Sequence, residues 1–201
     1  MHTYSISKVG TDALDPVSLT QAELDCRKQQ RILVEFYRKC APGFENACTL
    51  VLPSTMGLRE SRQIAGVYRI TEDDLRQDRI FPDGIGVSPG HDEHGKTTNG
   101  HDIPYRSLVP EKLDGLLAAG RCISADAVAQ NSIRGVIPCI VSGQGAGVAA
   151  TLAVKSGVQP RKVAAAKLRA RLDAQRVVLR KPAGAGGKKS DNKGARNTNA
   201  E

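Results

Sequence analysis

The sequence predicts an incomplete fold of the α/β class, an α+β fragment that ends in a disordered basic tail. Segments with apolar residues at helical spacing are interspersed with short apolar runs that are typical of buried strands. A glycine-rich apolar stretch at residues 142–151 predicts a closely packed segment. Residues 181–201 are rich in Gly, Lys, Ala and Asn, a composition that cannot bury a core.

The N-terminal part predicts one long helix. Residues 1–19 are polar and predict a loop. Thr20 and Glu23 match a capping box, in which each side chain bonds the backbone N–H of the other residue. The expected helix ends at Pro42, and its apolar residues at helical spacing are Leu33, Phe36, Tyr37 and Cys40.

Two short strands and a loop are expected in the middle of the chain. The apolar runs 48–52 and 64–70 predict the strands. Thr71 is expected to cap a short helix with three acidic residues in its first turn. Residues 82–100 contain five glycines, two prolines and two histidines, which predicts a long surface loop.

The C-terminal half predicts one strand and three helices. The strand is expected at 116–119, and a short helix at 125–136, broken by Pro138. A helix at 143–157 has small residues on all sides and should be buried. A basic helix follows within 158–180, at about residues 161–180, before the tail at 181–201.

Charge and cysteine content narrow the class of protein. The chain has 29 basic and 21 acidic groups, but 13 of the basic and only 3 of the acidic groups lie from Lys155 onward. No apolar run reaches about 18 residues and no secretory signal is visible, so we expect no membrane contact and a cytoplasmic location. The five cysteines form no C-x-x-C pair, so we predict free thiols and no metal site.

Five segments occur in the order expected for one family of flavoenzymes. They are Gly57-Leu-Arg-Glu-Ser-Arg62, Asp102-Ile-Pro-Tyr-Arg106, Ala119-Gly-Arg-Cys-Ile-Ser124, Val128-Ala-Gln-Asn-Ser-Ile-Arg134 and Gly143-Gln-Gly-Ala-Gly-Val-Ala-Ala150. With them the chain resembles the bacterial FAD-dependent oxidoreductase family, which is similar to the heterodisulfide-reductase-like flavoproteins.

The resemblance implies the C-terminal part of a two-domain flavoprotein of Rossmann-like type. Residues 1–100 would form part of the cap or substrate domain, and 101–157 the returning strand and helices of the FAD-binding domain. The implied cofactor is FAD, and the implied chemistry is hydride or electron transfer with a small-molecule substrate. Some relatives carry an iron–sulfur cluster, which the cysteine spacing of this chain does not support.

The resemblance also implies a set of cofactor-binding residues. The helix expected to start near Gly143 would aim its N–H groups at the pyrimidine edge of the flavin, where they stabilise negative charge on the reduced ring. His101 and Tyr105 are the candidates for proton transfer or substrate contact. The full cofactor-binding set is Gly120, Arg121, Asp126, Asn131, Ser132, Arg134, Gly143, Gln144, Gly145, Ala146 and Gly147.

Structural alternatives remain open for these residues. The glycines at 143–147 would equally allow a helix to pack closely on a strand. Arg121 and Arg134 could bind flavin or phosphate oxygens, or cap a strand end or pair with Asp126.

The chain departs from the family pattern in three places. It contains no G-x-G-x-x-G, and no βαβ unit precedes residue 56, so the pyrophosphate site is missing from it. Ala127 stands where relatives often carry His, and Gly145 where they carry Ala, which should loosen the helix start by about 0.5–1 kcal/mol. We therefore expect weak or absent FAD binding by the isolated chain, unless a second polypeptide supplies the Rossmann half.

Two other functions are compatible with the sequence. Residues 161–196 could form a non-catalytic basic module that binds nucleic acid or another acidic partner by counterion release. Aromatic residues and base-reading motifs are missing there, so nucleic acid is not the favoured partner. The chain could also be a remnant without function.

Overall fold

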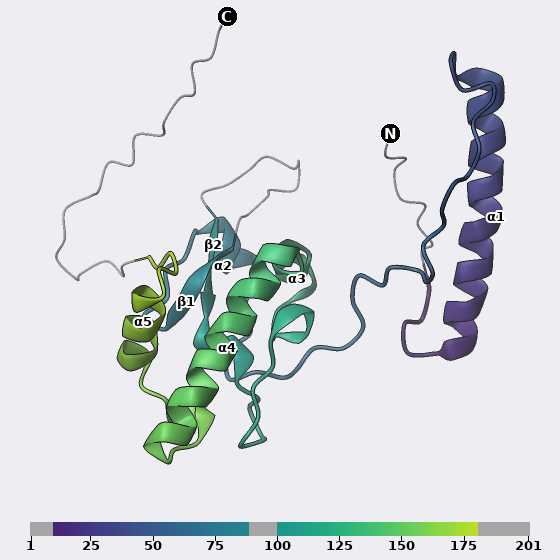
Figure 1. The fold of residues 1–201 in the computed structure, drawn as a ribbon. Helices are drawn as coiled ribbons and strands as arrows, with labels where there is room; N and C mark the ends of the chain where they lie inside the picture. The colour runs from purple at the N-terminus through teal and green to yellow at the C-terminus, as the bar shows by residue number, and fades with distance from the viewer. Residues whose placement is uncertain (1–9, 89–99, 181–201) are drawn as a thin grey trace, which may run out of the picture. The chain divides into compact units, whose positions relative to one another are not determined.

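The computed structural model describes residues 10–88 and 100–180 and divides the chain into two units, Met1–Arg62 and Gln63–Glu201 (Figure 1). The described residues form helices and one two-stranded sheet, which confirms the α+β class. The boundary expected at residues 100 and 101 lies inside the second unit. The predicted tail at 181–201 lies outside the described residues. So do His91 and His94, the two histidines of the loop predicted over 82–100.

The first unit contains one long helix, α1 (Pro16–Cys40). The capping box predicted at Thr20 is wrong, because the Asp15 carboxylate accepts the N–H groups of Val17 and Ser18, each at 3.1 Å. Asp followed by Pro is a strong helix start, since the fixed φ of proline suits the first helical position. The Thr20 hydroxyl lies inside the helix and donates to the Pro16 carbonyl at 2.8 Å.

The strand predicted at residues 48–52 is also wrong. These residues have an irregular backbone, and the side chains of Leu50 and Val51 are 89% and 83% exposed. A strand needs a neighbour for its N–H and C=O groups. Within residues 10–62 the structure contains no second strand to provide one.

The sheet of the second unit pairs β1 (Gly84–Ser88) with β2 (His101–Pro104) in antiparallel register. The loop predicted over 82–100 is therefore wrong at its start, and its remainder at 89–99 lies outside the described residues. Gly84 serves close packing rather than a turn. A Cβ built on Gly84 would lie 2.3 Å from Oδ2 of Asp102.

The strand predicted at 64–70 makes only isolated bridges, Gly66 to Pro110 and Ile70 to Ala125. The cap predicted after it is confirmed. Thr71 starts α2 (Glu72–Arg76), and the Thr71 hydroxyl and the Asp74 carboxylate each accept the N–H of the other residue.

The C-terminal elements differ from the prediction mainly in their bounds. The strand predicted at 116–119 is wrong, because these residues have an irregular backbone. They lead into a 3-10 turn, η2 (Gly120–Cys122). The short helix is confirmed as α3 (Ala127–Ile133). The next helix, α4 (Val136–Ser156), starts seven residues before the predicted Gly143. Pro138 does not break a helix here, because it lies in the first turn of α4, where its missing N–H costs nothing.

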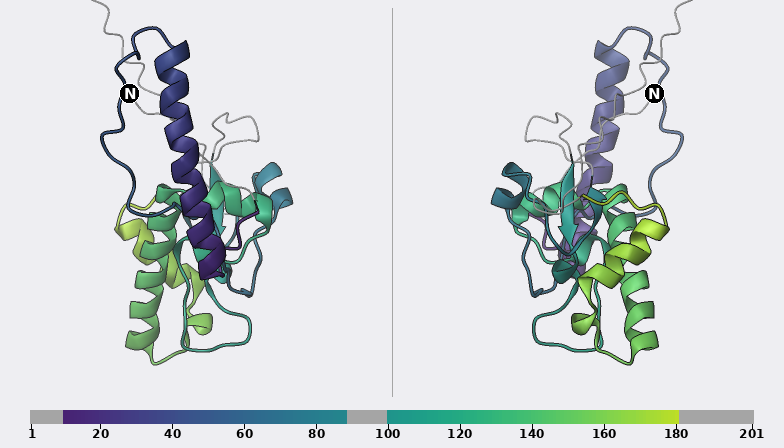
Figure 2. Two further views of the ribbon diagram at one scale, coloured as in Figure 1. Left: turned by 90° about the vertical axis from the view of Figure 1, so that its right-hand side faces the viewer. Right: turned by 90° about the vertical axis from the view of Figure 1, so that its left-hand side faces the viewer.

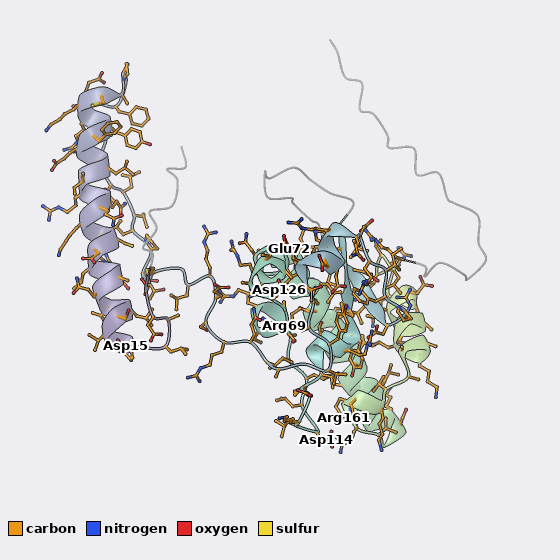
Figure 3. All side chains as sticks on the ribbon, turned by 180° about the vertical axis from the view of Figure 1, so that it is seen from behind. Asp15, Arg69, Glu72, Asp114, Asp126 and Arg161 are labelled. Atoms are coloured by element: carbon orange, nitrogen blue, oxygen red, sulfur yellow. The ribbon has the colours of Figure 1, made fainter. Side chains whose placement is uncertain are left out.

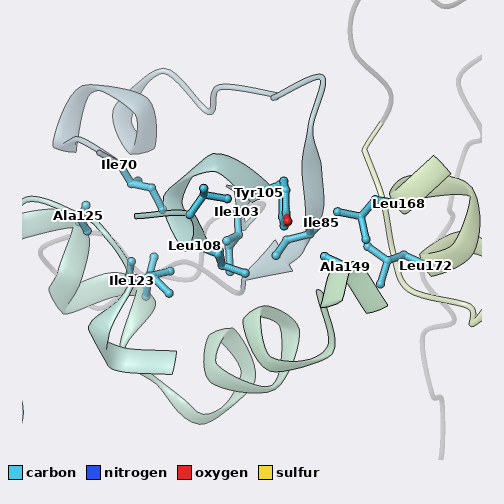
Figure 4. Packing of buried hydrophobic residues seen from close by; sticks show 13 residues of the cluster. Ile70, Ile85, Ile103, Tyr105, Leu108, Ile123, Ala125, Ala149, Leu168 and Leu172 are labelled. Carbon is cyan, nitrogen blue, oxygen red and sulfur yellow. The ribbon is translucent and has the colours of Figure 1, made fainter. Parts of the chain in front are cut away.

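The core of the second unit lies between the sheet, α4 and α5 (Ala165–Ala174), with the 3-10 turns η1 (Tyr105–Leu108) and η3 (Pro160–Lys162) beside them. Helix α5 lies next to α4 in both views of Figure 2. Its Leu168 and Leu172 are fully buried with Ile85, Ile103 and Ala149 (Figure 4). The predicted basic helix is thus shorter than 161–180, and it is part of the folded body.

Helix α4 also corrects the expectation about membrane-spanning length. An 18-residue window within its 21 residues has a mean hydropathy of 1.5, which makes it, within residues 10–88 and 100–180, the one helix that could cross a membrane by length and composition. One face of α4 is buried through Ser142, Gly145, Ala149 and Ala153. The core helix of a water-soluble domain satisfies the same criterion, so this finding is weak evidence for a membrane.

Candidate functional site

The structure brings the first predicted cofactor segment, Gly120 and Arg121, against α4 and α3. The Gly120 N–H donates to Oγ of Ser142 on α4 at 2.9 Å. The Arg121 carbonyl accepts Nε2 of Gln130 on α3 at 2.6 Å. Ser142 and Gln130 are both 0% exposed. The η2 turn is therefore fixed from two sides at the junction of the two helices.

Asp126 caps α3 and joins it to α2. Its carboxylate accepts the N–H groups of Ala129 and Glu72, both at 2.8 Å. Figure 3 shows Asp126 beside Glu72 and Arg69, and Arg69 Nε donates to the Ala125 carbonyl at 3.2 Å. These contacts give Asp126 a structural role at the helix start.

The side chain of Arg134 contacts Asn131 rather than Asp126. Its guanidinium donates to Oδ1 of Asn131 at 3.0 and 2.8 Å. The two residues lie at the end of α3, directly before Gly135, the N-cap of α4. Ser132 lies between them in the chain and is partly exposed. The end of α3 thus places a positive charge next to the start of α4, where the helix dipole is also positive.

The segment Gly143–Gly147 is in the middle of α4, so the predicted role of its N–H groups as a helix start is wrong. Gly145 faces the sheet, and a Cβ built on it would lie 2.5 Å from Cδ1 of Ile85. A Cβ on Gly143 or Gly147 would meet no atom within 4 Å. The close-packing alternative thus applies to Gly145, whereas Gly143 and Gly147 leave open surface.

The other two residues of this segment also have structural contacts. Gln144 donates through Nε2 to Oε1 of Gln175 at 2.9 Å. Ala146 is partly buried against the core. Their cofactor contacts stay predictions, as do those of the glycines.

Tyr105 and His101, the predicted catalytic residues, are both buried. The Tyr105 hydroxyl donates to the Pro160 carbonyl at 2.8 Å, and burial raises the pKa of this phenol to about 12. His101 is 6% exposed, and neither ring nitrogen has a hydrogen-bond partner in the described structure. The contact of Tyr105 is structural, and a catalytic role for either residue stays a prediction.

The buried imidazole leads to a prediction about acid stability. Burial lowers the pKa of His101 from its ordinary value of 6.5, with Asp78 opposing the shift and Arg180 adding to it. The unfolded chain therefore binds a proton that the folded chain does not, and the free energy of unfolding falls as the pH drops below about 6.5. We expect His101→Phe to reduce this acid-side loss, measured by urea denaturation at about pH 7.5 and 5.5. Equal losses in the variant and the parent would contradict the prediction.

Three arginines of the predicted basic segment 161–196 form hydrogen bonds and ion pairs within the second unit. Arg161 donates to the carbonyls of Pro110, Glu111 and Leu113 and pairs with Asp114 (Figure 3). Arg169 donates to the Gly84 carbonyl at 2.5 Å. Arg180 pairs with Asp78 and donates to the Gly100 carbonyl, both at 2.5 Å. These three side chains have partners within the fold, and the alternative of a basic module for acidic partners stays a prediction.

No metal centre is present in the part of the chain that the structure describes. Residues 10–88 and 100–180 hold no group of three or more His, Cys, Asp or Glu that could bind a metal ion. The five cysteines are free.

Sequence reasoning missed Ser142 and Gln130. Gln130 lies inside one of the five family segments and Ser142 directly precedes another, but their partners are backbone atoms 9 and 22 residues away. A polar residue directly after an apolar run, as Ser142 is after residues 136–141, is the signal that could have identified one of them.

A family model described as FAD dependent oxidoreductase matches residues 2–172. No curated protein and no solved structure matches significantly.

Proposed function

The chain belongs to the FAD dependent oxidoreductase family, and on this premise we propose that it supplies the flavin-ring side of the cofactor site. The observation that carries the proposal is the junction of η2, the end of α3 and the start of α4. It gathers Gly120, Arg121, Asn131 and Arg134 from two of the segments that resemble the family.

The residues at this junction suit the polar edge of a flavin. The first N–H groups of α4, from Val136 and Ile137, have no side-chain cap at Gly135. Arg134 adds a positive charge that Asn131 orients. Together they favour negative charge on the ring. A bound flavin would supply hydride or electron transfer, and the part of these residues is to bind, orient and stabilise charge.

We further propose that the ADP half of the cofactor is held by residues outside this sequence, in a longer chain or in a second polypeptide. The sequence has no G-x-G-x-x-G turn for the pyrophosphate. Helix α4 also leaves one apolar face uncovered, here called the outer face of α4 (Val136, Ile137, Ile140 and Val154, between 51% and 83% exposed). A helix that is apolar on all sides is normally buried, which supports a covering part of this kind.

A flavin titration tests the proposal. We expect the isolated chain to bind FAD weakly and to bind FMN within about threefold of FAD, because it offers no contact to the adenylate part. The measurement is the shift of the visible flavin bands on adding protein. Arg134→Gln should weaken binding about tenfold by removing a charged donor, whereas the exposed Arg171→Gln should not. Flavin bands that stay unshifted at millimolar FAD and FMN would contradict the proposed function.

A further inference from the structure

The η2 turn is held by two buried side chains from different helices. Ser142 accepts the Gly120 N–H at 2.9 Å, and its own hydroxyl donates to the Pro138 carbonyl one turn earlier in α4 at 2.8 Å. The donor and acceptor capacities of Ser142 are thus both used, and the serine connects the turn rigidly to α4.

The second contact comes from α3 and leaves one buried polar atom without a hydrogen-bond partner in the described structure. Gln130 donates Nε2 to the Arg121 carbonyl at 2.6 Å, but its Oε1 is buried and has no hydrogen-bond partner in the described structure. A buried acceptor without a partner destabilises the fold, and an apolar side chain of similar volume would avoid this loss. What Gln130 supplies is therefore the amide donor that fixes the Arg121 carbonyl.

The geometry of the turn depends on these contacts. Gly120 has a φ of 77°, in the left-handed region that suits glycine. Within the turn, the Ile123 N–H reaches the Gly120 carbonyl only at 3.4 Å, a long hydrogen bond. The two short contacts from Ser142 and Gln130 therefore help to set the position of Gly120 and Arg121, together with the Ile64 N–H, which donates to the Cys122 carbonyl at 2.9 Å.

We propose that Ser142 and Gln130 are positioning residues, which hold the η2 turn in the conformation that meets the flavin. The inference rests on the proposed function. It assigns to these residues an effect on flavin binding that is separate from their effect on stability.

The test compares two buried serines. Ser107 is also 0% exposed and donates to a proline carbonyl, that of Pro104, at 2.7 Å, but it makes no side-chain contact with η2 among its hydrogen bonds in the described structure. We expect Ser142→Ala to speed hydrogen exchange of the Gly120 amide about tenfold and to raise the Kd for FMN about tenfold, the effect of one hydrogen bond. Ser107→Ala should lower stability to a similar degree and leave both quantities unchanged. The measurements are amide exchange by NMR and the flavin titration on the full chain.

A third variant separates positioning from stability at the other contact. Gln130→Met removes the 2.6 Å hydrogen bond to the Arg121 carbonyl together with the unpartnered oxygen. These two effects on stability oppose each other, so we expect a small change in unfolding stability while the Kd for FMN rises. Faster Gly120 exchange with unchanged flavin affinity would overturn the inference and leave the proposed function standing. Equal effects of Ser107→Ala and Ser142→Ala on flavin affinity would also overturn it. If the parent chain shifts no flavin band, the proposed function has failed, and the inference falls with it.

Discussion

Replacing Leu168 with alanine is expected to lower the free energy of unfolding of the second unit by about 2–5 kcal/mol. Leu168 lies on α5, is 0% exposed and belongs to the same buried cluster as Ile85 and Ile103 of the sheet. Alanine would leave a cavity between α5 and the sheet, and the Arg169 guanidinium, which donates to the Gly84 carbonyl, would resist its collapse. The measurement is urea denaturation followed through the methyl signals of Ile85 and Ile103, which report on the second unit.

The matched control lies on the same C-terminal segment. Val178 is 75% exposed, and Val178→Ala should change the free energy of unfolding by less than about 0.5 kcal/mol. If Leu168→Ala behaved like Val178→Ala, α5 would not contribute to the stability of the second unit, and the basic-module alternative would gain support. The expected contrast makes α5 part of the body on which the candidate site is built.

Some local signals in the sequence predicted local structure correctly. The cap at Thr71 and the short helix α3 depend on residues within a few positions of each other. The capping box at Thr20 was a local signal that failed, because Asp15 with Pro16 starts the helix earlier.

The strand at 48–52 failed because an apolar run becomes a strand only if another segment pairs with it. The run 64–70 makes only isolated bridges, because its partners, Pro110 and Ala125, lie in two separate segments. The start of α4 was misplaced because proline was interpreted as a break, although the first turn of a helix tolerates it.

The candidate site was predictable in its segments but not in its contacts. The sequence motifs marked the turn at Gly120 and the helix that contains Ser142, and the structure joins them through one hydrogen bond. Neither periodicity nor motif spacing indicates that a serine hydroxyl will accept a backbone N–H 22 residues away. Likewise, Gly84 was predicted to lie in a loop. A glycine is needed at this position because the buried Asp102 carboxylate packs against it, and Asp102 lies on another strand.

The three glycines of α4 are expected to respond to alanine with opposite signs. At Gly145 the new Cβ would lie 2.5 Å from Cδ1 and 3.2 Å from Cβ of Ile85, which is fully buried on β1. Overpacking of this kind costs about 1–3 kcal/mol, against a gain of about 1 kcal/mol from helix propensity. We therefore expect Gly145→Ala to lower the free energy of unfolding by up to about 2 kcal/mol, the difference between these terms.

Gly143→Ala and Gly147→Ala should each raise the free energy of unfolding by about 0.5–1 kcal/mol, because their Cβ atoms meet nothing within 4 Å. Urea denaturation of the three variants measures the signs, and a loss at all three positions would contradict the packing described here. The same variants decide what the open glycines do. If Gly143→Ala or Gly147→Ala stabilises the fold and weakens flavin binding, the missing side chain makes room for the cofactor. If flavin binding is unchanged, these two glycines are ordinary exposed helix positions, and the cofactor site is confined to the η2 turn and the start of α4.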